Sequence, residues 1–417
     1  MKLLHICGIF LVMAIVSARA ATDSVEKIAD DSTCAQALAW IDKNARWVTD
    51  QQIALSEIPA PEFSEAKRGE YLQKLLEATG LKVHLDKTGN VVGERAGADA
   101  NSIILLAAHL DTVFPTGTDV RVKKNGNRIV GPGIADNGAG LAALVGVARA
   151  LSEGRVRTNK TIVLAGDVGE EGEGNLRGIR ALIEAYGSRL AAVIAVDGAS
   201  TEHITTQGIA SHRFEVTITG PGGHSWSDFG APNPITALAR GIVKFSSFAV
   251  PEDPRSSYNF GVVEGGTSVN SIPARAVVKV DLRSEAEAEI TKMESALRDA
   301  MQAGMKEEMA AVRDPHAQLQ VNFRSLGLRP AGKLPENSPL LDSIRSVDRF
   351  LGTRSRLERS STDANIPLSL GIPAISIGGG GKANGSHTLD EWYDPAGREL
   401  GLKRLFLTTV VLAGLQQ

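Results

Sequence analysis

The chain has 417 residues, of which 43% are hydrophobic and 22% charged, and its formal net charge is −3. This is the composition of a folded protein, and the length exceeds what one ordinary core accommodates, so two or more domains are expected. Near-neutrality without long runs of like charge argues against a basic surface for nucleic acid and against a charged membrane-binding tail. We therefore expect no nucleic-acid partner.

Residues 1–20 have the pattern of a signal peptide. Lys2 precedes an apolar stretch from Leu3 to Ser17, and Ala18-Arg19-Ala20 provides a small-residue cleavage motif. The stretch is shorter than the ~20 residues that a membrane-spanning helix requires, so cleavage is favoured over anchoring. Cleavage leaves Cys34 as the single cysteine, which excludes an intramolecular disulfide. We expect export to the periplasm or the medium, with no membrane association afterwards.

Four apolar runs of strand length predict a sheet that is buried on both faces. They comprise residues 102–108, 160–165, 191–196 and 372–377. Helical patterns at 138–152 and 176–186 separate the first three runs, and helices at 35–55 and 64–79 and a hairpin at 81–94 come before them. This alternation predicts an α/β fold with an open, mostly parallel sheet flanked by helices.

Residues 211–325 follow a different pattern, which predicts an inserted ferredoxin-like lid domain. The expected order is βαββαβ. Its elements are a strand at 212–219, a helix at 235–248, strands at 258–264 and 276–282, a helix at 285–313 and a strand at 318–323. The catalytic domain would then consist of two parts, residues 21–210 and 326–417.

Side chains that commonly bind metals follow the predicted strands. They are His109 and Asp111, Glu170 and Glu171, Asp197 and His387, together with Asp136 just before a predicted helix. Each one alone has an ordinary explanation, such as a helix cap, a turn or a solvated charge. Because ligands of open α/β sheets gather at the carboxyl ends of the strands, the joint placement favours a metal site.

Two imidazoles and three carboxylates can hold two divalent ions, with Zn²⁺ as the leading candidate and Co²⁺ or Mn²⁺ as alternatives. One carboxylate must bridge the pair, and a separation of ~3.5–4 Å between the ions leaves room for a hydroxide between them. The adjacent Glu170 and Glu171 fit a division in which one binds metal and the other acts as general base. Asp111, two residues beyond His109, suits an outer partner that fixes the imidazole ring.

These motifs resemble a family of di-zinc peptidases and deacylases that includes glutamate carboxypeptidase, acetylornithine deacetylase, succinyl-diaminopimelate desuccinylase, peptidase T and carnosinase. The resemblance covers nearly the whole mature chain. The motifs that carry it are His109–Pro115, Gly131–Gly138, Gly169–Gly172, Ser361–Asn365 and Gly385–Thr388.

The resemblance implies a role for each ligand. His109 and Asp197 would hold one zinc ion, Glu171 and His387 the other, and Asp136 would bridge both. Glu170 would be the general base, and the peptide bond between Asp136 and Asn137 would be cis.

The resemblance also implies a homodimer that forms through the lid domain. His224 of one chain would polarise the scissile carbonyl at the partner subunit's metals, which makes it a candidate catalytic residue with Glu170 and Asp111. Asn270 and Arg283 resemble positions that bind a substrate carboxylate. Two simpler explanations stay open, because Asn270 can shape a turn and Arg283 can pair with Asp281.

Asp197 and the run Ser361–Asn365 are most similar to the peptidase T-like branch, which favours hydrolysis of a peptide bond in small peptides. The alternative is an N-acyl amino-acid deacylase or desuccinylase that uses the same site. A catalytically inactive binding homologue is a further alternative, although all five ligand positions and Glu170 are filled. The sequence contains no Gly-x-Ser-x-Gly motif, which argues against a serine hydrolase of that type.

Overall fold

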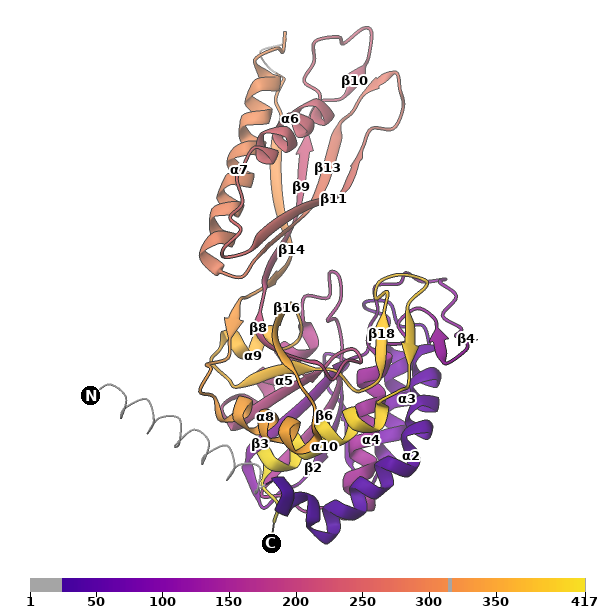
Figure 1. The fold of residues 1–417 in the computed structure, drawn as a ribbon. Coiled ribbons are helices and arrows are strands. Elements are labelled where there is room, and N and C mark those ends of the chain that lie inside the picture. The colour runs from indigo at the N-terminus through magenta and orange to yellow at the C-terminus, as the bar shows by residue number, and fades with distance from the viewer. Residues whose placement is uncertain (1–24, 314–316, 417) are drawn as a thin grey trace, which may run out of the picture. The chain divides into compact units, whose positions relative to one another are not determined.

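The computed structural model describes residues 25–313 and 317–416, so the predicted signal peptide lies outside the described residues. The described residues form two compact units (Figure 1), a main unit of residues 25–207 and 332–416 and an inserted unit of residues 208–313 and 317–331. The inserted unit extends a few residues beyond the predicted range of 211–325 at both ends. Within the described residues, no helix is long and apolar enough to cross a membrane.

The main unit contains a sheet with nine strands in its described part. Four neighbouring strands are parallel: β6 (Lys160–Asp167), β3 (Asp99–His109), β7 (Leu190–Val196) and β17 (Ala374–Ile377). They correspond to the four predicted apolar runs. On one side β2 (Val91–Arg95) and β1 (Lys82–Leu85) continue the sheet, and on the other side β8 (His203–Gly208), β15 (Gly332–Lys333) and β16 (Arg356–Ser360) do so. The expected mostly parallel centre is therefore confirmed.

Helices cover this sheet and bury it. α4 (Gly138–Glu153) and α10 (Arg398–Ala413) pack on β3 and β6, and α2 (Ser32–Ser56) packs on α4. β6 lies on one side of β3 and β7 on the other. The general rule of right-handed crossovers therefore assigns α4 and α5 (Arg177–Tyr186) to opposite faces of the sheet. Further helices of the main unit are α3 (Ala66–Glu77), α8 (Pro339–Leu351) and α9 (Asn365–Ser369).

A small antiparallel sheet joins two segments that are far apart in the sequence. Its order is β18 (Lys382–Asn384), β19 (Trp392–Asp394), β5 (Arg128–Val130) and β4 (Lys123–Asn125). The pairing of β19 with β5 brings the loop that follows β5 next to the segment that precedes β19. The loop with Asp136 and the loop with His387 are connected in this way.

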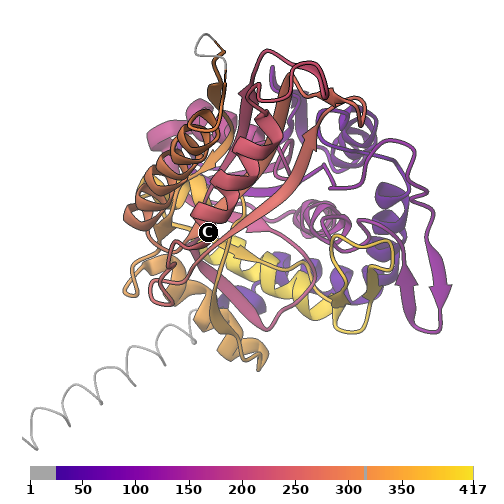
Figure 2. The ribbon, with the colours of Figure 1, turned by 90° about the horizontal axis from the view of Figure 1, so that it is seen from above.

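The inserted unit has the predicted βαββαβ order. Its elements are β9 (Ala210–Thr219), α6 (Pro234–Ser246), β11 (Ser256–Gly265), β13 (Arg275–Ser284), α7 (Glu287–Met309) and β14 (Gln320–Arg329). The antiparallel sheet has the order β11-β13-β9-β14, and α6 and α7 lie side by side on it (Figure 2). A short pair, β10 (Gly223–His224) with β12 (Ser271–Ile272), lies outside this sheet.

Candidate metal centre

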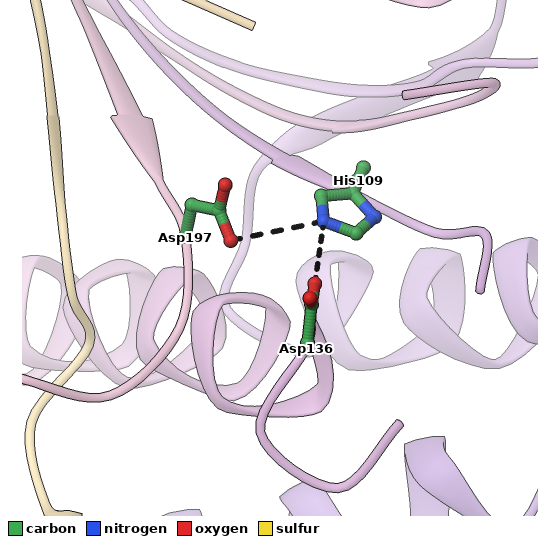
Figure 3. A group of neighbouring side chains, drawn as sticks. All are labelled: His109, Asp136 and Asp197. Carbon is green, nitrogen blue, oxygen red and sulfur yellow. Dashed lines mark ion pairs between the residues drawn. The ribbon is translucent and has the colours of Figure 1, made fainter. Parts of the chain in front are cut away.

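His109 is the last residue of β3, and its imidazole is buried. Its Nδ1 lies 3.1 Å from the main-chain oxygen of Asp111, so Nε2 is the nitrogen that faces the site. That Nε2 lies 3.1 Å from Oδ1 of Asp136 and 3.8 Å from Oδ1 of Asp197 (Figure 3). These three side chains form the first group of candidate ligands.

Asp136 also faces a second imidazole. Its Oδ2 lies 3.3 Å from Nε2 of His387, and the same Nε2 lies 3.0 Å from Oε1 of Glu171. Asp136, Glu171 and His387 form a second group of candidate ligands, and His109, Glu170 and Glu171 a third. The structure thus brings all five predicted ligands and Glu170 together, with one oxygen of Asp136 directed at each histidine.

The carboxylates change the protonation of both histidines. Burial alone would lower the pKa of His109, but the carboxylates of Asp136 and Asp197 hold that pKa well above its usual value. Hydrogen bonds to Asp136 and Glu171 raise the pKa of His387 to about 10. Burial alone would raise the pKa of Asp136, yet the two imidazoles hold it far below its usual value.

This cluster favours positive charge at both histidines, and two divalent cations would supply that charge in place of the two ring protons. Imidazole nitrogen and carboxylate oxygen are the ligand types that Zn²⁺, Co²⁺ and Mn²⁺ accept. The residues present therefore fit a two-metal site, with Asp136 between the two ions.

The structure differs from the expectation for the Asp111 carboxylate. Its Oδ1 is 3.9 Å from Nδ1 of His109, which is too long for a hydrogen bond. The carboxylate instead accepts three main-chain N–H bonds, from Gly169 at 2.8 Å, Glu170 at 3.1 Å and Glu171 at 2.7 Å. The main-chain carbonyl of Asp111 orients the imidazole, and its side chain holds the loop with Glu170 and Glu171.

The peptide bond between Asp136 and Asn137 is cis, which confirms that expectation. Asn137 caps α4 by accepting a hydrogen bond from the N–H of Gly140. Its side-chain amide donates to the main-chain oxygen of Val196 at 2.8 Å, and its oxygen also accepts from the N–H of Gly198. Asn137 thus connects the Asp136 loop to the strand end with Asp197, a contact that the sequence pattern did not predict.

Two further buried carboxyl groups lie behind the ligands. Asp167 and Asp363 are almost completely buried and influence each other's protonation. Burial raises the pKa of Asp167 to about 7, and burial together with Asp167 raises the pKa of Asp363. Asp363 lies in the predicted Ser361–Asn365 motif, whereas Asp167 follows an apolar strand without any motif of its own.

His224 and Asn270 lie together in the inserted unit. β10 pairs with β12, and the N–H of Ser225 donates to the main-chain oxygen of Asn270 at 3.0 Å. Nδ1 of His224 accepts hydrogen bonds from the N–H groups of Trp226 and Ser227, at 3.2 and 3.3 Å. The neutral ring therefore carries its proton on Nε2, and the exposed imidazole can act as a hydrogen-bond donor.

Arg283 is separated from that pair within the inserted unit. It lies near the end of β13, and its guanidinium donates to the carboxylate of Asp281 at 2.7 Å. His224 and Asn270 lie beyond the Arg275 end of the same strand. At a rise of about 3.3 Å per residue, eight residues of strand separate the two ends by about 26 Å. Within one inserted unit, Asn270 and Arg283 cannot bind the same carboxylate.

Comparison with known proteins adds family evidence to this geometry. A family described as "Peptidase family M20/M25/M40" matches residues 105–408. A Mycobacterium tuberculosis protein that carries the name succinyl-diaminopimelate desuccinylase DapE is 25% identical over 346 residues, which cover 81% of this chain and 91% of that protein.

Solved structures share the fold. A tripeptidase from Staphylococcus aureus matches with a TM-score of 0.72 and 20% identity, over 89% of this chain and 99% of its own. A Bacillus subtilis dinuclear metal-binding peptidase of the M20 family matches with a TM-score of 0.63 and 16% identity, over 89% of this chain and 99% of its own.

Proposed function

The chain belongs to peptidase family M20/M25/M40, and from that premise we propose that it is a di-zinc hydrolase that cleaves a peptide bond in small peptides. The observation that carries the proposal is Asp136, whose two oxygens face two imidazoles from opposite parts of the chain. His109 and Asp197 would hold one ion, Glu171 and His387 the other, and Asp136 would bind both. Elemental analysis of the purified protein after zinc titration tests this, and one ion or fewer per chain would refute it.

Two divalent ions at these positions would polarise the scissile carbonyl and make a water molecule acidic enough to attack at neutral pH. In this ligand assignment, Glu170 is the residue of the cluster that binds neither ion. Its carboxylate would accept the proton of the attacking water and pass it to the nitrogen of the departing amine. Because Asp111 holds the N–H groups of both Glu170 and Glu171, it fixes the base relative to the ligand.

Three observations bear on the substrate. Asp197 occupies a position whose residue type differs between the peptidase T-like branch and the deacylases of the family it resembles, and an aspartate there favours peptides. The fold shared with a tripeptidase favours peptides as well. The similarity to a desuccinylase over 81% of the chain favours the alternative, an N-acyl amino-acid deacylase. Dipeptides and tripeptides assayed beside N-acetyl and N-succinyl amino acids, with one zinc-loaded preparation, decide between them. Turnover of the acylated series alone would refute peptide hydrolysis, and turnover of neither would support a binding homologue.

We also propose that the protein acts as a homodimer through the inserted unit. β11 is an edge strand of the inserted sheet, and it exposes 61% of Val263 and 39% of Val262. An exposed apolar edge strand is suited to pair with a second copy across a two-fold axis. The distance between Asn270 and Arg283 supports the same assembly, because two chains could bring the two residues to one substrate.

A complementation experiment tests the dimer and the role of His224. Glu170→Gln lacks the base and His224→Ala lacks the donor, so each homodimer should be inactive. After dissociation and mixing, the heterodimer should regain one working site, because one metal cluster is intact and the other chain supplies His224. A mixture that forms heterodimers and stays inactive would refute delivery of His224 by the partner, as would a monomeric active protein.

Export is proposed from residues 1–20 alone. A mature protein that starts close to Ala21, found by N-terminal sequencing after fractionation of the source cells, would support it. An uncleaved chain in the soluble cell interior would refute it.

A further inference from the structure

Glu391 is a fully buried carboxylate that the proposed reaction does not use. It lies four residues after His387 and accepts three main-chain hydrogen bonds. Its Oε2 accepts from the N–H of Gly133 at 2.7 Å, and its Oε1 accepts from those of Ala135 and Asp136 at 2.8 Å each. One of the three donors is therefore the main-chain N–H of the proposed bridging residue itself.

The fold brings these segments together through the small sheet. β19 pairs with β5, and the N–H of Gly131 donates to the main-chain oxygen of Glu391 at 2.8 Å. Gly133 and Glu391 are 258 positions apart in the sequence, so this contact forms only when the C-terminal segment is in place. Glu391 thus connects the loop that carries one proposed ligand to the segment that carries another.

We propose that Glu391 is a positioning residue, which holds the Gly133–Asp136 loop so that the Asp136 carboxylate faces both proposed metal ions. The proposal rests on the two-metal function stated above. A loop shift of about 1 Å is enough to impair a catalytic arrangement, and three hydrogen bonds to one buried carboxylate restrict such a shift strongly.

Asp111 provides an internal comparison, because it holds the Glu170–Glu171 loop with the same three-donor pattern. The guanidinium of Arg68 is fully buried, and the charges of both Asp111 and Glu391 act on it favourably. The guanidinium itself donates to the main-chain oxygens of Ser56, Ile58 and Leu110. A role confined to the stability of the fold is the competing explanation.

Glu391→Gln separates these explanations. The Gln oxygen can still accept from Ala135 and Asp136, but its NH₂ group would face the N–H of Gly133. Positioning predicts a ~10–100-fold loss in metal affinity and kcat, with KM changed by no more than about twofold. Titration with Co²⁺ should show an altered visible absorption spectrum, because the geometry at the bridging carboxylate changes. Asp390→Asn, an exposed neighbour, is the matched control and should behave as the wild type.

Wild-type affinity, spectrum and kcat in Glu391→Gln would overturn the proposal, and so would a lower unfolding temperature with an unchanged Co²⁺ spectrum. Hydrogen exchange of the metal-free wild type gives a second test that needs no variant. The amides of Ala135 and Asp136 should be protected without metal, and exchange at unprotected rates would overturn the proposal. Failure of the underlying function is recognised separately, because the wild type would then bind fewer than two Co²⁺ ions.

Discussion

Asp111→Asn tests whether the Asp111 side chain acts on the Glu170–Glu171 loop or on the imidazole of His109. The side chain is fully buried and accepts from three N–H groups, two at Oδ1 and one at Oδ2. Asn keeps one oxygen, which can retain the bonds from Gly169 and Glu170. Its NH₂ group then points at the N–H of Glu171, so that bond is lost and two donors oppose each other.

The structure sets the expected magnitude. One hydrogen bond to a charged group contributes about 1.5–3 kcal/mol, and the two retained bonds weaken because the acceptor becomes neutral. Arg68 also loses one of the two carboxylates that compensate its buried charge. We therefore expect a total cost of about 2–4 kcal/mol. If half or more of that cost falls on the loop geometry, kcat/KM falls ~5–700-fold, since about 1.4 kcal/mol corresponds to a factor of ten.

The measurement combines kcat/KM with stepwise metal binding and urea unfolding of the metal-free protein. The main-chain carbonyl that orients His109 is unchanged in the variant, so the ion held by Glu171 should weaken more than the ion held by His109 and Asp197. Preferential loss of the His109 ion, with the Glu171 ion intact, would show that the carboxylate acts on the ring after all. Unchanged kcat/KM and metal affinity would refute the reasoning entirely.

Three other outcomes are expected. Glu170→Gln should retain both ions while turnover falls by ~10²–10⁴, whereas Glu171→Gln should lose one ion by elemental analysis. Equal metal loss in both variants would refute this division of roles. Zinc at a thousandfold excess over its Kd should stabilise the folded protein by about 4 kcal/mol. EDTA should remove this stabilisation in a thermal melt. A melting temperature unaffected by EDTA would contradict a metal site that exists only in the folded protein. Burial raises the folded-state pKa of Asp167 to about 7, so metal-free stability should fall as pH rises between about 4 and about 7. Because burial also raises the pKa of Asp363, Asp167→Asn should reduce that fall without removing it, and the variant should be more stable than the wild type at pH 8 but not at pH 4. An identical pH dependence would mean that Asp167 stays ionised throughout.

The central sheet and the ligands could be predicted from the sequence for a physical reason. A strand buried on both faces must be apolar along its length, and a ligand at its carboxyl end must interrupt that run with a polar residue. β3 with His109 and β7 with Asp197 both show this junction. The inserted βαββαβ unit was equally accessible, because alternating and helical periodicities are local properties of the chain.

The residues that hold the site could not be predicted, since their partners are main-chain atoms of distant loops. Glu391 follows His387 in a polar segment, where a glutamate usually indicates a solvated charge. Its three hydrogen bonds depend on the pairing of β19 with β5, which no local pattern encodes. Asp111 was identified from its spacing to His109, but spacing cannot decide whether the carboxylate or the carbonyl reaches the ring.

The short strands at the sheet edges, such as β15 and β16, were missed for a related reason. They are only partly buried, so their residues are not constrained to a recognisable pattern.

The two anchoring carboxylates explain how the ligand loops of Asp136 and Glu171 can be arranged before metal arrives. Without metal, the positive charges of the His109 and His387 imidazoles offset part of the repulsion within the cluster. The carboxylates of Asp136, Glu171 and Asp197 still outnumber them and would separate if their loops were free. The loops of Asp136 and Glu171 are instead held through their main chains, by Glu391 and Asp111 respectively, so these two ligand side chains need not bear the restraint. Main-chain anchoring also leaves the carboxylate oxygens of the ligands available for cations. The repulsion therefore lowers the stability of the metal-free folded chain, and metal binding relieves it. Removal of the metal by a chelator should consequently destabilise the protein. It should not displace the Gly133–Asp136 loop, because Glu391 holds that loop without metal.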